Sequence, residues 1–206
     1  MGVGDTYEYG ATGHTLETFE WDRTWIERAN RRDARRVLYI GDSISNATLR
    51  EATAATDKQL LFDGFATSKA LDNPYFAPAL RLFAAEEGAR VAVVFNNGLH
   101  GWHLEDTAEY GEHYARMIEF LMEEFRGTPL VLLTSTPVRD AERCARVRAR
   151  NEVVRALAEK YGLTVVDFYA AVCDREDLLL PDGVHFCAEG YEILAKTLAD
   201  ALPALL

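Results

Sequence analysis

Short apolar runs alternate with longer segments of helical periodicity along most of the chain, and this alternation constrains the fold more than any other feature. The short runs are rich in Val, Leu, Ile and Phe, and turn residues end them. Alternating strands and helices are typical of a parallel sheet that is covered by helices. The sequence predicts strands at 37–40, 59–62, 91–95, 130–134 and 163–168, and helices at 45–56, 78–87, 106–125, 142–161 and 188–202.

The predicted connections are long enough to return each strand parallel to the last through a right-handed crossover. A doubly wound sheet of five strands most often has the order 2-1-3-4-5, so we expect a three-layer α/β sandwich of the flavodoxin-like type. Residues 36–206 are predicted to form this domain, since a chain of 206 residues with 49% hydrophobic residues suits one sizeable core. Residues 1–35 are predicted to be an N-terminal helical extension, helical from about 16 to 31. It would pack over the sheet or serve as a substrate-binding or dimer-forming arm.

Charge argues against one class of partner. The formal net charge is -11 and the pI is near 4.9, so nucleic-acid phosphates would approach a surface of their own sign. Arginines cluster at 31–36 and 143–155, but acidic residues interrupt both runs, which favours solvated helix faces. We therefore expect no nucleic-acid partner.

Location and redox state follow from simpler features. The cysteines Cys144, Cys173 and Cys187 are odd in number and lack metal-ligand spacing, which fits a reducing compartment. The chain shows neither a signal-peptide pattern at its start nor 18 consecutive apolar residues. We expect a soluble, cytoplasmic protein without a membrane partner, and its oligomeric state stays open.

The first predicted strand ends in Gly41-Asp42-Ser43, a turn that would place Ser43 at the start of a helix. Ligands of open parallel sheets bind at the carboxyl ends of the strands, so this serine would be exposed in the crevice. The helix dipole and free backbone N–H groups would stabilise negative charge there, as a nucleophile requires. The alternative is that Asp42 or Ser43 only caps the helix.

A second signal lies just before the final helix, where Asp182 and His185 are three residues apart in a turn. This spacing lets the carboxylate bind one imidazole nitrogen while the other faces outward, as a general base requires. The alternative is an aspartate that starts a turn and a histidine that caps a helix. Ser43 and this pair follow the first and last strands, so they would converge on one edge of the crevice.

Gly41-Asp42-Ser43 and the later Asp182-Gly-Val-His185, in that order and at those ends of the chain, resemble the SGNH or GDSL hydrolase superfamily. The texts NEVVRALAEKYGLTVVD at 151–167 and DGVHFCAEGYEILA at 182–195 also resemble that family. The resemblance implies the SGNH hydrolase fold and a catalytic triad in which Ser43 attacks an ester carbonyl. His185 would take the serine proton and Asp182 would orient His185.

The resemblance also implies an oxyanion hole made of the serine N–H, a glycine N–H after the second strand and an asparagine amide after the third. Gly64 fits the glycine. The third block departs from the family pattern, because the chain reads FNNGLHG at 95–101. We favour Asn96 as the amide donor, with Asn97 second and His100 third, since any of the three supplies a donor for the oxyanion.

Two further residues are predicted near the crevice. His100 and Trp102 are candidates for the substrate pocket, where Trp102 would floor a sugar or acyl site or simply pack. The spacing of His100, His103 and His113 is not that of a metal site. The predicted function is a serine esterase with no cofactor and no metal, acting on a small-molecule or carbohydrate ester, with acetylated carbohydrates favoured. The alternatives are an acyltransferase on the same triad and a non-catalytic carbohydrate-binding domain.

Overall fold

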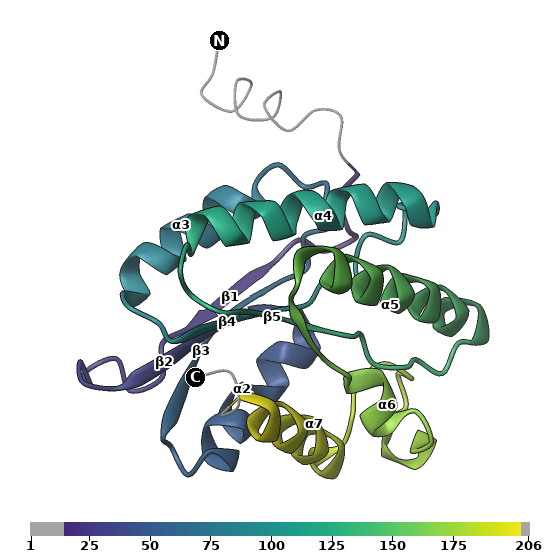
Figure 1. Ribbon diagram of the computed structural model, residues 1–206. Coiled ribbons are helices and arrows are strands. Elements are labelled where there is room, and N and C mark those ends of the chain that lie inside the picture. The colour runs from purple at the N-terminus through teal and green to yellow at the C-terminus, as the bar shows by residue number, and fades with distance from the viewer. Residues whose placement is uncertain (1–14, 203–206) are drawn as a thin grey trace.

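A computed structural model describes residues 15–202, and its centre is a six-stranded sheet with the order β1-β3-β2-β4-β5-β6 (Figure 1). Strands β2 to β6 are parallel, and β1 runs antiparallel to β3 at the edge. The strands are β1 (Asp22–Trp25), β2 (Arg35–Gly41), β3 (Leu60–Thr67), β4 (Ala92–Phe95), β5 (Leu130–Leu133) and β6 (Thr164–Val166).

Helices cover both faces of the sheet (Figure 1). Helices α3, α4 and most of α5 pack on one face, and α2, α6 and α7 pack on the other. The helices are α2 (Ser43–Ala55), α3 (Phe76–Glu87), α4 (Thr107–Glu124), α5 (Ala141–Tyr161), α6 (Phe168–Val172) and α7 (Ala188–Ala201), with a 3-10 turn at Glu176–Leu178.

The central strands are buried on both faces, as a parallel sheet between two helical layers requires. In β2, Val37 and Tyr39 belong to the core under α2 and α7, whereas Leu38 and Ile40 belong to the core under α3 and α4. This period of two divides one apolar run between two cores. The predicted three-layer α/β sandwich is confirmed, and its five predicted strands have the order 2-1-3-4-5.

Strand β3 is longer than predicted. The sequence predicts it at 59–62, but it continues to Thr67 and all of its residues are buried. Asp63 interrupts the apolar run, and the structure buries it against Arg36, whose Nη1 donates to both carboxylate oxygens at 2.9 Å. A buried ion pair of this kind is invisible to a search for apolar runs.

The helix predicted from about 16 to 31 is wrong within the described residues, which form the edge strand β1 and turns. Arg36 explains the turns, because its guanidinium donates to the carbonyls of Glu27, Arg28 and Arg31 at 3.0–3.1 Å. The backbone N–H of Glu27 also donates to Asp63 at 2.7 Å. These tertiary contacts override the helical pattern. The predicted boundary at residue 35 stays a prediction.

Within residues 15–202, no helix combines the length and the apolar character needed to span a bilayer.

Candidate active site

Ser43 is the first residue of α2, directly after the turn that ends β2. The N-cap of the helix is Asp42, whose Oδ1 accepts a 2.9 Å hydrogen bond from the N–H of Ile44. The capping alternative therefore holds for Asp42 and not for Ser43, whose hydroxyl is directed to another partner. The N–H of Ser43 has no acceptor among residues 15–202. It stays available at the positive end of the helix dipole.

Asp182 and His185 lie in the turn between the 3-10 helix and α7. Asp182 Oδ1 accepts hydrogen bonds from the N–H groups of Val184 and His185, each at 2.9 Å. Gly183 has a φ of 72°, and a Cβ there would lie 2.8 Å from the side chain of Arg139, so only glycine fits this turn. The turn thus fixes the carboxylate beside the imidazole.

The structure brings Ser43, His185 and Asp182 into one line of hydrogen bonds. The Nδ1 atom of His185 lies 2.8 Å from Asp182 Oδ2, and its Nε2 atom lies 2.8 Å from Ser43 Oγ. Because a carboxylate only accepts, Nδ1 carries the proton and Nε2 is left to accept from the serine hydroxyl. The serine and the histidine are 142 positions apart in the sequence.

Hydrogen bonds keep Asp182 ionised. The N–H groups of Val184 and His185, followed by the imidazole of His185, lower the pKa of the Asp182 carboxyl to about 2. The carboxylate therefore stays charged at any ordinary working pH, as the orienting partner of a base requires.

Gly64 does not occupy the expected place after the second predicted strand. It lies inside β3, paired with Trp25 of β1 on one side and Tyr39 of β2 on the other. Its missing side chain serves packing, because a Cβ there would lie 2.9 Å from Leu49 of α2. The expectation failed because β3 continues beyond residue 62.

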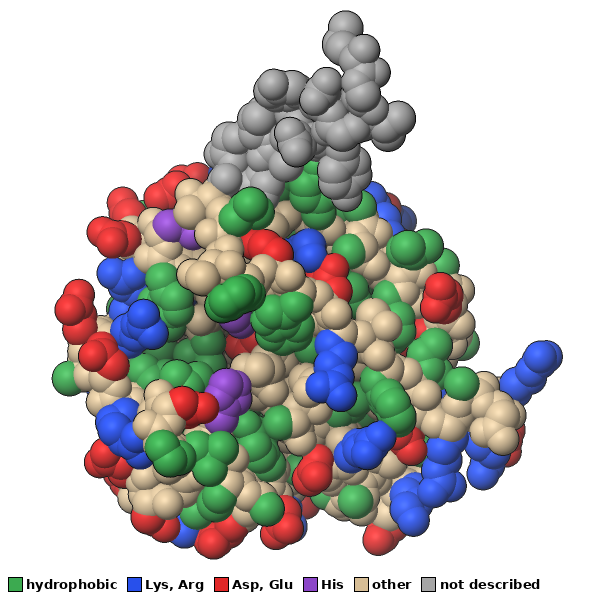
Figure 2. Space-filling view, turned by 180° about the vertical axis from the view of Figure 1, so that it is seen from behind, with side chains coloured by type: hydrophobic (Ala, Val, Ile, Leu, Met, Phe, Trp, Pro, Cys, Tyr) green, Lys and Arg blue, Asp and Glu red, His purple; other side chains and the backbone are tan. Residues whose placement is uncertain are grey.

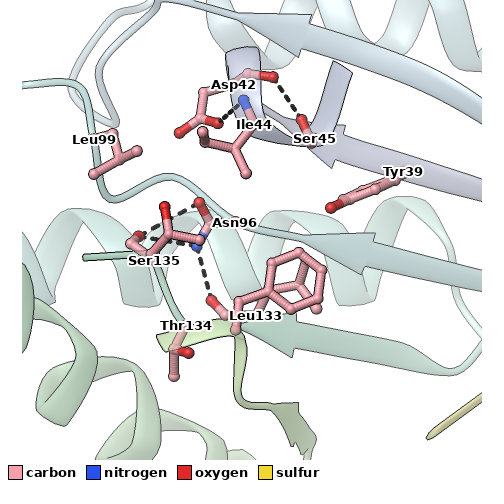
Figure 3. Close-up of a pocket in the computed structure, with 11 residues that line it drawn as sticks. Tyr39, Asp42, Ile44, Ser45, Asn96, Leu99, Leu133, Thr134 and Ser135 are labelled. Atoms are coloured by element: carbon pink, nitrogen blue, oxygen red, sulfur yellow. Dashed lines mark hydrogen bonds between the residues drawn. The ribbon is translucent and has the colours of Figure 1, made fainter. Parts of the chain in front are cut away.

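Asn96 and Asn97 both follow β4, but their amides point to opposite sides. Asn96 Nδ2 donates to the carbonyl of Leu133 at 2.8 Å and to Ser135 Oγ at 3.1 Å, toward β5 (Figure 3). Asn97 Nδ2 donates to the carbonyl of Lys69 at 2.9 Å, beyond the end of β3. Since β2 lies between β3 and β4, the Asn97 amide crosses the end of β2, where Ser43 follows.

A small cavity of about 10 Å³ lies beside the turn after β2 (Figure 3). Asp42, Ile44 and Asn96 are among its lining residues. This volume is about that of one water molecule, so the cavity is too small for an ester substrate. A substrate of Ser43 has to approach from the open crevice.

His100 packs against the N-terminal segment, which the sequence left without an assigned contact. Its Nδ1 lies 3.6 Å from Glu17 Oε1, and its ring meets that of Trp21 edge to face at a centroid distance of 6.2 Å. Glu17 also accepts a 2.6 Å hydrogen bond from the N–H of Gly101. Burial lowers the pKa of His100, but Glu17 and the charges of Asp42 and Glu20 outweigh it, and the net pKa is raised.

Arg150 corrects the interpretation of the 143–155 run as a solvated face, because its side chain is buried. Its guanidinium donates to four carbonyls of the loop that carries His100 and Trp102. These are the carbonyls of Gly98, His100, Gly101 and Leu104, at 2.6–3.1 Å. One sequence offers no signal for this role, since the carbonyls lie about 50 residues away.

A second histidine of this loop, His103, also contacts a carboxylate. His103 Nε2 lies 2.9 Å from Asp72 Oδ2. Among the described residues, no three His, Cys, Asp or Glu side chains form a group that would hold a metal ion.

The sheet is a doubly wound α/β sheet, and a serine, a histidine and an aspartate lie in line at its carboxyl edge. This combination of fold and site is typical of serine hydrolases. The chain matches the model of the GDSL-like lipase/acylhydrolase family over residues 3–193, and it belongs to that family. The predicted resemblance is confirmed.

Solved structures share the fold. A lipolytic protein of the G-D-S-L family from Veillonella parvula has a TM-score of 0.69 and 16% identity, covering 82% of this chain and 99% of its own. Est24, a carbohydrate acetylesterase from Sinorhizobium meliloti, has a TM-score of 0.65 and 15% identity, with coverages of 84% and 100%. The acetyl xylan esterase AlAXEase has a TM-score of 0.63 and 18% identity, with coverages of 81% and 99%. No curated protein matches the chain.

Proposed function

We propose that this acylhydrolase is a serine esterase with Ser43 as nucleophile, His185 as general base and Asp182 as the residue that orients His185. The observation that carries the proposal is the pair of 2.8 Å contacts from His185, one to Ser43 Oγ and one to Asp182 Oδ2. Nucleophile, base and orienting carboxylate within hydrogen-bond reach are what acyl transfer by serine needs.

In the first step His185 Nε2 takes the proton of Ser43 as Oγ attacks the ester carbonyl carbon. The tetrahedral intermediate collapses, the bond to the leaving oxygen breaks, and His185 gives its proton to the departing alcohol. An acyl group then remains on Ser43. In the second step His185 takes a proton from water, which attacks the acyl carbonyl, and the acid leaves as Ser43 regains its proton.

For the oxyanion hole we propose the N–H of Ser43 together with the side-chain amide of Asn97. The N–H of Ser43 is free among residues 15–202 and sits at the start of α2. Asn97 donates one amide hydrogen to the carbonyl of Lys69, so its other amide hydrogen is available to the oxyanion. Asn96 is the weaker candidate because its amide bonds to Leu133 and Ser135. We leave Gly64 out of this proposal because it lies inside β3.

Acetyl esters of carbohydrates are the substrate class that we propose. The shared fold with a carbohydrate acetylesterase and an acetyl xylan esterase supports this choice. Transfer of the acyl group to a sugar hydroxyl on the same residues is the second candidate, because the acyl-enzyme accepts whichever hydroxyl reaches it.

The test is the hydrolysis of p-nitrophenyl acetate and p-nitrophenyl butyrate by the wild type, Ser43→Ala and Asn46→Ala. Asn46 is in the same helix and serves as the matched control. We expect turnover by the wild type and the control, and a loss of at least about 10³-fold in kcat for Ser43→Ala. Equal activity of Ser43→Ala and the wild type, with both folded, would contradict the proposal.

Acyl-enzyme trapping separates hydrolysis from the alternatives. A fluorophosphonate should add one covalent group to the wild type and none to Ser43→Ala, as seen in the intact mass. Labelling of Ser43 without ester hydrolysis would favour acyl transfer. The absence of both would favour a binding domain that has retained the fold.

A further inference from the structure

Three arginines of α5 gather around the indole of Trp102. Their guanidinium carbons lie 5.3 Å (Arg143), 5.8 Å (Arg146) and 5.1 Å (Arg150) from the ring centroid. Spacings of three and four residues place these side chains on one face of the helix. The sequence pattern predicts a solvated helix face for the arginines at 143–155, and the structure instead brings three of them to Trp102.

The three charges differ in what they bind. Arg150 is buried and gives its hydrogen bonds to loop carbonyls. Arg146 donates to the carbonyl of Trp102 at 2.6 Å and lies 3.7 Å from Glu105. Arg143 is exposed and forms no ion pair with any carboxylate among residues 15–202. Its guanidinium is therefore free to bind an anion.

The surroundings do not neutralise this charge. Glu105 lies beside Arg146, the charge of Glu17 acts on Arg150, and Asp140 Oδ1 caps α5 by accepting from the backbone N–H of Arg143. Neither Glu105 nor Glu17 pairs with Arg143 itself, and the positive end of the α5 dipole adds to its charge. This unpaired charge is a local feature, because the whole chain has a net charge of -11.

The cluster borders the proposed active site. Trp102 belongs to the same loop as Asn97, after β4. On the other side, the N–H of Arg139 donates at 2.8 Å to the carbonyl of Gly183, in the turn that holds His185, and Arg143 follows four residues later in the first turn of α5. Figure 2 shows a hollow lined by hydrophobic side chains, with basic side chains, acidic side chains and a histidine along its rim.

We propose that Trp102, Arg143 and Arg146 form a subsite for a carboxylate on the alcohol portion of the ester. Trp102 orients the guanidinium groups through cation–π contacts, and Arg143 offers its planar fork to the carboxylate. The substrate class is therefore an ester whose alcohol portion is anionic. This inference rests on the proposed esterase function and adds the recognition of charge to it.

The experiment compares two acetate esters, 4-acetoxybenzoate and its neutral analogue 4-acetoxybenzamide. The measured quantity is the ratio of their kcat/KM values, anionic over neutral, in the wild type, Arg143→Gln, Arg146→Gln and Arg148→Gln. Arg148 lies in the same helix but contacts Cys144 and Tyr169 instead of Trp102, so it controls for the general loss of one charge.

We expect the ratio to fall about threefold to tenfold in Arg143→Gln and Arg146→Gln, mainly through KM for the anionic ester, and to stay near the wild-type value in Arg148→Gln. Added salt should lower the wild-type ratio as well. An unchanged ratio in the first two variants, or an equal fall in all three, would overturn the subsite.

A binding measurement keeps the subsite testable apart from turnover. Calorimetry with Ser43→Ala should show tighter binding of 4-hydroxybenzoate than of 4-hydroxybenzamide, and Arg143→Gln in that background should remove the difference. If neither ester is hydrolysed but 4-hydroxybenzoate still binds more tightly than 4-hydroxybenzamide, the esterase function is refuted and the anion site stands. Hydrolysis without any preference would refute the subsite alone.

Discussion

The guanidinium of Arg150 donates a 2.6 Å hydrogen bond to the carbonyl oxygen of Gly101, and this contact joins the middle of α5 to the loop after β4. The same side chain bonds to the carbonyls of Gly98, His100 and Leu104. No carboxylate pairs with it among residues 15–202, so loop carbonyls provide its solvation. The loop that carries Asn97 and Trp102 is thus shaped from inside by one buried cation.

Replacement of Arg150 by lysine should therefore destabilise the protein. A single ammonium has three donors and no planar fork, so it cannot serve four carbonyls at once. We expect Arg150→Lys to lower the free energy of unfolding by about 2–4 kcal/mol, since buried acceptors lose their partners. Urea denaturation measures this. Arg148→Lys, at an exposed site of the same helix, should change stability by less than about 0.5 kcal/mol, and equal effects would contradict the role of Arg150.

The opposite directions of the two asparagine amides predict different effects on rate and stability. Asn97→Ala removes the proposed oxyanion donor, so kcat should fall about 10²–10³-fold while KM changes little. Asn96→Ala removes the hydrogen bonds to β5, so it should mainly lower the free energy of unfolding by about 1–3 kcal/mol. Steady-state kinetics and urea denaturation of both variants separate the two effects. A larger loss of kcat in Asn96→Ala would restore Asn96 as the donor.

The contact between Glu17 and His100 makes a prediction about ionisation. Glu17 is the main group that raises the pKa of His100 against the effect of burial. We expect Glu17→Gln to lower the pKa of His100, as measured by NMR titration of its ring protons. Asp72→Asn is the matched control, because Asp72 pairs with His103. A similar shift of His100 in both variants would show that the Glu17 contact does not set its pKa.

Local patterns in the sequence predict five of the six strands, their order and the meeting of Ser43 with Asp182 and His185. Ser43 follows a strand end, and Asp182 and His185 lie in one turn, so each position depends on a few neighbouring residues. Contacts between distant residues explain what the sequence misplaces. The sequence places Gly64 at a strand end because Asp63 interrupts the apolar run of β3, although the strand continues to Thr67.

The N-terminal segment shows the same limit. The sequence predicts a helix from about 16 to 31, but Arg36 binds the carbonyls of this segment and β3 supplies a strand edge for β1. The roles of Glu17 and Arg150 depend on partners 84 and about 50 positions away. A periodicity in one sequence carries no information about such partners.

A buried carboxyl at the amino end of the sheet predicts how stability depends on pH. The Glu87 side chain has no exposed surface, and neither of its oxygens has a hydrogen-bond partner among the described residues. Burial, together with the nearby Asp63, raises the pKa of Glu87 from 4.5 to about 8 despite the charge of Arg90. Protonated Glu87 is a donor and can bond to the Asp63 carboxylate, whereas ionised Glu87 repels it.

Because the pKa of Glu87 is higher in the folded state than in the unfolded state, the folded state binds more protons between about pH 4.5 and pH 8. The contribution of Glu87 to stability is therefore fully present below pH 4.5 and is lost as the pH rises through about 8. We expect the free energy of unfolding to decrease from pH 5 to pH 9 in the wild type and to decrease less in Glu87→Gln, which cannot ionise. The exposed neighbour gives the control Glu86→Gln, which should follow the wild type. Parallel curves for the wild type and Glu87→Gln in urea denaturation would show that this carboxyl does not hold a proton in the folded protein.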